Sequence, residues 1–112
     1  RTPGRKMITT TTHSIEGTVV TAYLGIVVGE AIIGANIIKD LFAAVRDVVR
    51  GRTGACEEAL RTARARALRE MSPKAQELGA YAVIGVDIDY EVLGKAGSML
   101  MVTSAGTAVK LG

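Results

Sequence analysis

Asp87, Asp89 and Glu91 are the residues of this chain whose types and spacing could do chemistry. In a β-strand, side chains alternate between faces, so the three carboxylates would share one face and the apolar residues between them the other. Neighbouring carboxylates repel each other and invite a counter-charge, either an Arg or Lys or a hard divalent cation such as calcium, magnesium or manganese. Two interpretations follow: a solvated or ion-paired face, with Arg46 or Arg64 as candidate partners, and a metal site formed by Asp87, Asp89 and Glu91.

A site for a soft heavy metal would need clustered thiolates or imidazoles, and the chain contains one cysteine and one histidine. His13 and Cys56 are far apart in sequence, so one subunit is not expected to form such a site by itself. In a symmetric ring, copies of one side chain could still meet at the axis. Cys56 falls on the apolar side of a predicted helix, which favours a buried, unreactive thiol. The cofactor therefore stays unidentified, with a divalent metal ion as the candidate.

No catalytic arrangement is recognisable in the sequence. One His and one Cys do not supply a catalytic triad. The stretch from Gly29 to Gly34 has no Lys, Ser or Thr where a phosphate-binding loop needs them. We therefore expect a protein that is not an enzyme; an active site assembled from carboxylates of several subunits is the alternative.

The net charge of +3 comes entirely from Arg1, Arg5 and Lys6, so the rest of the chain is balanced. A nucleic-acid partner is not expected, because the body has no basic surplus and aromatic residues, at 4%, are too few for stacking platforms. Residues 1–6 precede Met7 and are interpreted as a flexible basic flank, either an expression remnant or an upstream extension. We assign a single domain to residues 7–112.

Neither a secreted nor a membrane protein is indicated. A lone cysteine excludes an internal disulfide, and four threonines follow Ile8 where a signal peptide would be apolar, so a cytoplasmic protein is expected. Residues 19–38 are long enough to span a bilayer. Their β-branched side chains, glycines and central Glu30 instead favour a buried strand, and no membrane partner is expected.

Hydrophobic periodicity and turn residues predict six elements in the order β-β-α-α-β-β. Strands are predicted at residues 8–11, 19–32, 82–91 and 98–110. The second strand is expected to bend or bulge at Gly25 or Gly29. The first two strands are expected to form one hairpin and the last two strands another, in a mostly antiparallel sheet. The two helices lie between these hairpins in the sequence, so the predicted class is α+β.

Two amphipathic helices separate these hairpins. The first begins at Asn36 as its cap and stops at Gly51. The second runs from about residue 55 toward 78, with Pro73 as a kink or a new start. Its predicted apolar line is Cys56, Leu60, Ala63, Ala67, Met71 and Leu78.

Two helices can cover only one face of a four-stranded sheet, yet residues 24–28 and 99–102 are apolar on both sides. A strand that is apolar on both faces is usually buried on both. An uncovered apolar face would also promote aggregation. We therefore expect an obligate homo-oligomer in which another copy covers the second face.

The sequence block at residues 29–36 reads Gly-Glu-Ala-Ile-Ile-Gly-Ala-Asn, and a Gly-Arg-Thr-Gly turn at 51–54 follows it. Between them stand Asp40, Phe42 and Arg46-Asp47, and further stretches at 78–80, 82–91, 97–102 and 104–109 continue the pattern. From Met7 to Leu111 this pattern resembles the YbjQ family, whose members are labelled heavy-metal-binding proteins.

The resemblance implies a small, two-layer, dodecin-like subunit that assembles into a ring of five. It carries over no catalytic residues. One departure is Cys56, which stands where family members commonly have an aromatic residue. The expected function is a homo-oligomeric, pentameric cytoplasmic binding or scaffold protein; the alternative is a metal-binding protein whose carboxylates meet in the ring.

Overall fold

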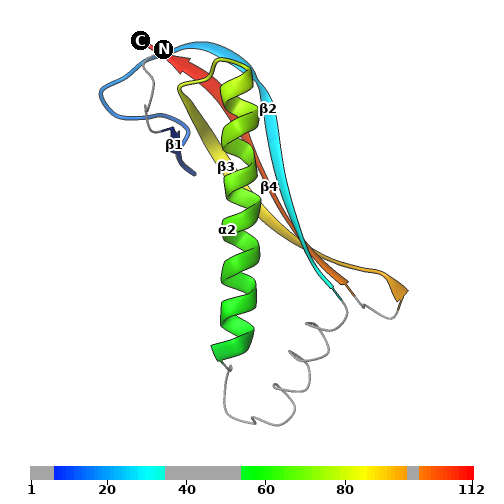
Figure 1. Cartoon of the computed structure of the whole chain (residues 1–112). Helices are drawn as coiled ribbons and strands as arrows, with labels where there is room; N and C mark the ends of the chain where they lie inside the picture. The colour runs from blue at the N-terminus through cyan, green and yellow to red at the C-terminus, as the bar shows by residue number, and fades with distance from the viewer. Residues whose placement is uncertain (1–6, 35–53, 96–98) are drawn as a thin grey trace.

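The computed structural model describes residues 7–34, 54–95 and 99–112 (Figure 1). The elements in these ranges are β1 (Ile8–Thr9), β2 (Val20–Ile33), α2 (Gly54–Glu77), β3 (Ala82–Leu93) and β4 (Met99–Leu111). They confirm the α+β class. The helix predicted between Asn36 and Gly51, and with it Arg46, lies outside the described residues.

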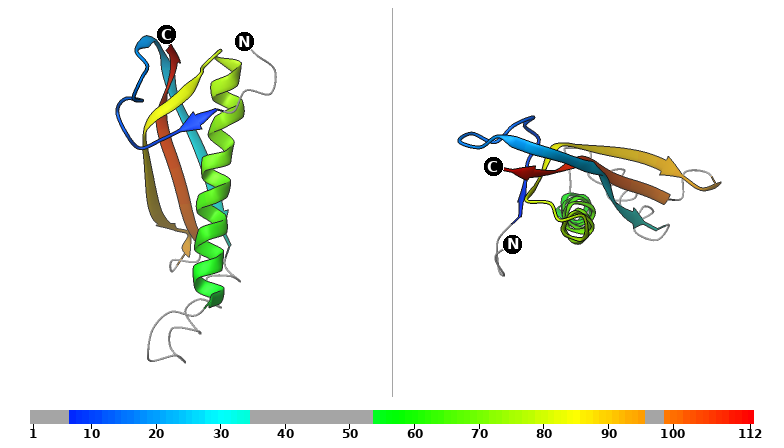
Figure 2. Two further views of the ribbon diagram at one scale, coloured as in Figure 1. Left: turned by 90° about the vertical axis from the view of Figure 1, so that its left-hand side faces the viewer. Right: turned by 90° about the horizontal axis from the view of Figure 1, so that it is seen from above.

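The strands form one mixed sheet in the order β1-β3-β4-β2, and α2 packs across one face, which gives two layers (Figure 2). β3 and β4 form the predicted antiparallel pair, and β4 also pairs antiparallel with β2. The predicted hairpin of the first two strands is wrong, because β1 lies parallel to β3. Strand length explains why β2 pairs with β4 and not with β1: the 14-residue β2 matches the 13-residue β4, whereas β1 has only two residues to pair.

Residues 20–33 of the stretch that was long enough for a membrane span form β2, an edge strand of the sheet. Its pairing with β4 shifts between Tyr23 and Gly25, where Gly25 has a φ of 135°. The predicted bulge is therefore confirmed at Gly25, a residue type that adopts positive φ without strain. Within the described ranges, no helix has the length and apolar character needed to cross a bilayer.

α2 faces the sheet with small side chains at four-residue spacing, which is the period that keeps residues on one helix face. The buried residues of this line are Ala63, Ala67, Met71 and Ala75. They pack against all three long strands in two clusters along the helix. α2 continues through Pro73, so no new helix starts there.

Gly29 allows α2 to lie very close to β2. A Cβ atom at this position would overlap the backbone carbonyl of Ala67 and lie 2.9 Å from Oγ of Ser104. From β4, the buried Ser104 hydroxyl donates a hydrogen bond of 2.8 Å to the same Ala67 oxygen. The first glycine of the block at 29–36 is therefore a packing residue, and one hydroxyl fixes the helix above it.

β1 and the loop after it are held on β3 by backbone hydrogen bonds around a bulge. The pairing of β3 with β4 shifts next to Gly85, whose φ is 63°. The amides of Gly85 and Val86 donate to the carbonyls of Thr12 and Thr10 at 2.8 and 3.0 Å. The chain beyond this loop covers one end of the sheet face opposite α2, where Ile15 packs on buried residues of β3 and β4.

Candidate functional site

The sheet face opposite α2, here called the open face, carries acidic residues on β3 and apolar residues on β2. Asp87, Asp89 and Glu91 share this face, as strand alternation predicted. The register through β4 aligns these three residues, in order, with Val28, Glu30 and Ile32 of β2. The β4 residues between them are Met101, Thr103 and Ala105.

Asp87 and Asp89 form a close carboxylate pair. The pKa of Asp89 is raised above its ordinary value of 3.8. The negative charge of Asp87 is the largest cause, followed by a hydrogen bond between the two side chains, desolvation and the charge of Glu91. The pair is therefore a place where a proton, or another cation, relieves repulsion.

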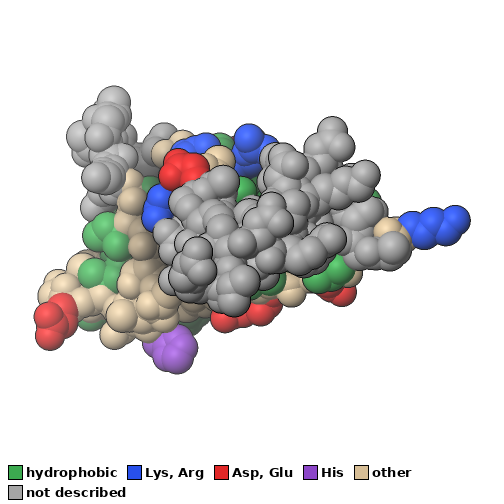
Figure 3. Space-filling model, turned by 90° about the horizontal axis from the view of Figure 1, so that it is seen from below, with side chains coloured by type: hydrophobic (Ala, Val, Ile, Leu, Met, Phe, Trp, Pro, Cys, Tyr) green, Lys and Arg blue, Asp and Glu red, His purple; other side chains and the backbone are tan. Residues whose placement is uncertain are grey.

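No basic side chain of the described residues pairs with these three carboxylates. Arg64, a partner expected from the sequence, lies on the α2 side of the sheet, where its Nη1 donates to the Tyr90 hydroxyl at 3.3 Å. Arg61 pairs along α2 with Glu58 at 3.0 Å. Figure 3 shows most of the basic side chains along one margin and most of the acidic ones along the other. α2 also carries Glu58, Glu70 and Glu77, so the separation of charge between the two layers is partial.

The β2 part of the open face is apolar and exposed. Ile26 is 76% exposed and Ile32 is 54% exposed, and Val28 lies between them. The apolar side chains on the other face of β2 are buried under α2. Apart from Glu30, β2 is therefore apolar on both faces, and the described residues cover only one of them.

The described residues do not form a metal site by themselves. No group of three or more His, Cys, Asp or Glu side chains suited to a metal ion is found in these ranges. His13 is exposed in the loop after β1. Cys56 lies in the first turn of α2, and its side chain is outside the described part.

The two soft donors are also far apart along the fold. The threonines that precede His13 border a cavity together with Arg69 and Ser72 of α2. Cys56 is thirteen residues from Arg69, about 20 Å along the helix axis at 1.5 Å per residue. A thiolate and imidazole site within one subunit does not fit this arrangement. Asp87 and Asp89 fit a hard cation better, with further ligands from elsewhere.

Sequence reasoning missed a cleft of about 320 Å³ between the β1 segment, α2 and β3, here called the β1–α2 cleft. Its lining residues are Thr9, Thr10, Thr11, Leu68, Arg69, Ser72, Val86 and Ile88. The threonine run after Ile8 was the available signal. A second cavity of about 410 Å³ lies between the end of β2 and α2, and it includes Glu58 and Arg66.

Two comparisons with known proteins bear on this arrangement. A family model named YbjQ, with the description "Putative heavy-metal-binding", matches residues 7–112. The chain is also similar to a crystal structure of a protein of unknown function that belongs to the DUF74 family, from Pediococcus pentosaceus ATCC 25745. The TM-score is 0.54 at 18% sequence identity, over 95% of this chain and 98% of the other. At this identity the similarity establishes a shared fold.

Proposed function

Because the chain belongs to the YbjQ family, we propose that it is a homo-oligomeric binding or scaffold protein whose subunits cover one another's open faces. A closed ring of five is the number that the family resemblance implies. The proposal includes no catalytic role, because the one His and the one Cys, His13 and Cys56, lie too far apart to act as a base and its nucleophile. It includes a cytoplasmic location, which rests on the lone cysteine.

The exposed apolar row of β2 carries this proposal. Ile26, Val28 and Ile32 point away from α2 along one edge strand of the sheet. Burying one such side chain completely is worth about 1.5–3 kcal/mol. Exposed apolar side chains gathered on one strand face, here with Glu30 between Val28 and Ile32, mark an interaction surface in a folded protein.

Charge complementarity supports a second copy as the cover. Asp87 and Asp89 have no basic partner among the described residues, and Arg66 on α2 likewise has no ion pair there. These groups lie in different layers of the subunit, so a head-to-tail contact would bring unlike charges of two copies together. Head-to-tail contacts generate rings when the rotation closes.

Sedimentation equilibrium at micromolar concentration tests the assembly. We expect five times the chain mass of 11.7 kDa for the parent protein, and a smaller species for Ile32→Lys, which places a charge in the apolar row. Leu78→Lys is the matched control, because Leu78 is 44% exposed in the turn after α2, away from the open face. A parent protein that is a stable monomer, or an Ile32→Lys variant that keeps the full mass, would refute the proposal.

Metal binding is the second candidate, and the Asp87–Asp89 pair favours it. The charge of Asp87 raises the pKa of Asp89, and neither group has a basic partner in the described chain, so the two carboxylates attract a cation. The ligands would be Asp87, Asp89 or Glu91, completed by another subunit. A hard ion such as calcium, magnesium or manganese suits oxygen donors of this kind.

Calorimetric titration of metal-stripped protein with calcium, manganese and zinc tests this candidate. We expect calcium or manganese to bind the parent and not an Asp87→Asn, Asp89→Asn double variant. Glu77→Gln is the control, since this carboxylate is exposed on α2. If the double variant still binds the ion, the site lies elsewhere; if zinc alone binds, the hard-ion assignment is wrong.

A further inference from the structure

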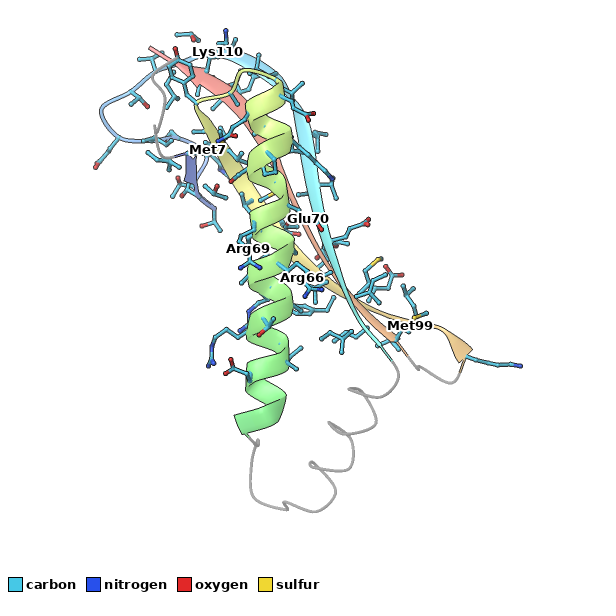
Figure 4. All side chains as sticks on the ribbon, viewed as in Figure 1. Met7, Arg66, Arg69, Glu70, Met99 and Lys110 are labelled. Atoms are coloured by element: carbon cyan, nitrogen blue, oxygen red, sulfur yellow. The ribbon has the colours of Figure 1, made fainter. Side chains whose placement is uncertain are left out.

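The β1–α2 cleft lies on the α2 side of the sheet and is formed by three segments far apart in sequence. Thr9, Thr10 and Thr11 form one wall, Leu68, Arg69 and Ser72 of α2 the second, and Val86 and Ile88 of β3 the third. Its volume of about 320 Å³ is close to the lower end of the range for small-molecule sites. Figure 4 shows Arg69 on the β1 side of α2 and Arg66 on the side of β2.

The polar groups of the cleft are not used by the fold. Within residues 7–34, 54–95 and 99–112, the Arg69 guanidinium makes no ion pair or hydrogen bond, and neither do the hydroxyls of Thr9, Thr11 and Ser72. The Thr10 hydroxyl, in contrast, bonds to Thr12. One cation and three free hydroxyls therefore converge on the same space. Such convergence of polar groups in a pocket is typical of a ligand site.

The rest of the lining is apolar. Val86 is 7% exposed, and Leu68 packs against the core cluster to which Val86 belongs. Ile88 is half-buried and packs with the second cluster under α2. A ligand that reached these side chains would place an apolar group on them while its polar end stayed at the rim with Arg69.

We propose that the β1–α2 cleft binds a small organic monocarboxylate with a short apolar tail. Arg69 would pair with the carboxylate, because a guanidinium offers two parallel N–H donors to the two oxygens. Thr9, Thr11 and Ser72 would donate further hydrogen bonds, and the tail would lie against Leu68, Val86 and Ile88. A single cation matches a single negative charge, whereas a phosphate dianion would leave charge unbalanced and the apolar wall unused.

This inference goes beyond the proposed oligomer and can fail independently of it. The cleft lies on the α2 side of the sheet, and the apolar row of β2 is on the open face. The Ile32→Lys variant separates the two questions, because it changes the assembly surface without altering any residue of the cleft.

Titration with hexanoate, followed by ligand-observed NMR and calorimetry, tests the proposal. Saturable binding with a Kd on the order of 1 mM is expected for so small a ligand. Arg69→Gln keeps the stem and removes the charge, and it should weaken binding roughly tenfold or more. Arg61→Gln is the matched control: it removes one exposed charge from the same helix, which pairs only with Glu58 within the described residues, and it lies outside the cleft.

Hexanol and inorganic phosphate complete the experiment. We expect both to bind at least tenfold more weakly than hexanoate. Equal binding of hexanol would remove the carboxylate from the proposal, and equal binding of phosphate would remove the apolar tail. Hexanoate binding that Arg69→Gln leaves unchanged, or that Arg61→Gln weakens equally, would overturn the site. So would the absence of saturable hexanoate binding by the parent protein.

Discussion

Gly29 is the residue where sequence and packing are most tightly linked. We expect Gly29→Ala to destabilise the protein by about 3 kcal/mol, since the new Cβ would meet the rigid Ala67 carbonyl of α2 and not a flexible side chain. Urea unfolding measures the loss. Gly34→Ala is the control: its Cβ would meet no atom within 4 Å, and a change within about 0.5 kcal/mol is expected. Equal effects at both positions would contradict the close approach.

The Asp87–Asp89 pair makes a prediction about pH. Folding raises the pKa of Asp89, so its protonated form is favoured in the native state. This contribution is fully present below the ordinary value of 3.8 and is lost as pH rises through the raised pKa. In metal-stripped protein in which no second copy pairs with Asp89, Asp89→Asn should therefore be more stable than the parent at pH 7, and the difference should shrink as the pH falls below 3.8.

Urea midpoints at pH 7 and below pH 3.8 measure this difference, with Glu77→Gln as an exposed carboxylate control on α2. A gain in stability that is independent of pH would show that ionisation is not its source. A loss of stability at pH 7 would mean that Asp89 is paired with a cation or with a basic residue of another subunit.

At the scale of elements, α2 protects the edge strand β2. The Glu30 amide donates to the Glu70 carboxylate at 3.0 Å, and the Val28 carbonyl accepts from Lys74 Nζ at 2.6 Å. Both backbone groups lie on the strand at the end of the sheet order. Unpaired edge groups of this kind are templates for strand addition.

We expect a Glu70→Ala, Lys74→Ala double variant to lose about 1–2 kcal/mol of stability and to aggregate faster. Thioflavin T fluorescence and urea unfolding measure the two effects. A Gln76→Ala, Glu77→Ala variant is the control, because these exposed residues of the same helix make no side-chain hydrogen bond or ion pair to the strand in the described chain. The protective role is refuted if both variants aggregate at the rate of the parent.

The long elements could be predicted from sequence because their side-chain periods are local. Alternation placed Asp87, Asp89 and Glu91 on one face, and the i, i+4 period identified Ala63, Ala67 and Met71 as buried. The same period predicted that Leu78 would join this apolar line, but Leu78 is 44% exposed. The reason is that α2 ends at Glu77 and the next residue belongs to a turn.

Non-local features could not be predicted in the same way. A two-residue strand carries no pattern that selects its partner, so the parallel pairing of β1 with β3 depends on contacts made by the loop after it. The β1–α2 cleft was missed for a related reason, since it combines Thr9, Arg69 and Ile88 from three segments. The YbjQ resemblance is confirmed over residues 7–112. The metal-binding role of the three carboxylates and the Cys56 environment stay predictions.

At the scale of the whole molecule, self-association should be coupled to stability. If the folded subunits associate through the open face, a tenfold increase in protein concentration adds about 1 kcal/mol of apparent stability per chain. Urea midpoints at 1-fold and 10-fold concentration measure this dependence. Ile32→Lys should abolish it and Leu78→Lys should preserve it. A midpoint that does not depend on concentration would count against an obligate oligomer.

The bulge at Gly85 determines which side of the sheet is acidic. Val83 and Val86 are three residues apart, yet both pack in the cluster under α2, whereas a regular strand would point them in opposite directions. The extra residue reverses the parity of every position after it. If the same residues formed a regular strand without this bulge, Val86 would point to the open face, and Asp87 and Asp89 would point inward under α2. The charge of the open face therefore depends on the backbone conformation at Gly85, where φ is 63°, as well as on the side chains of β3.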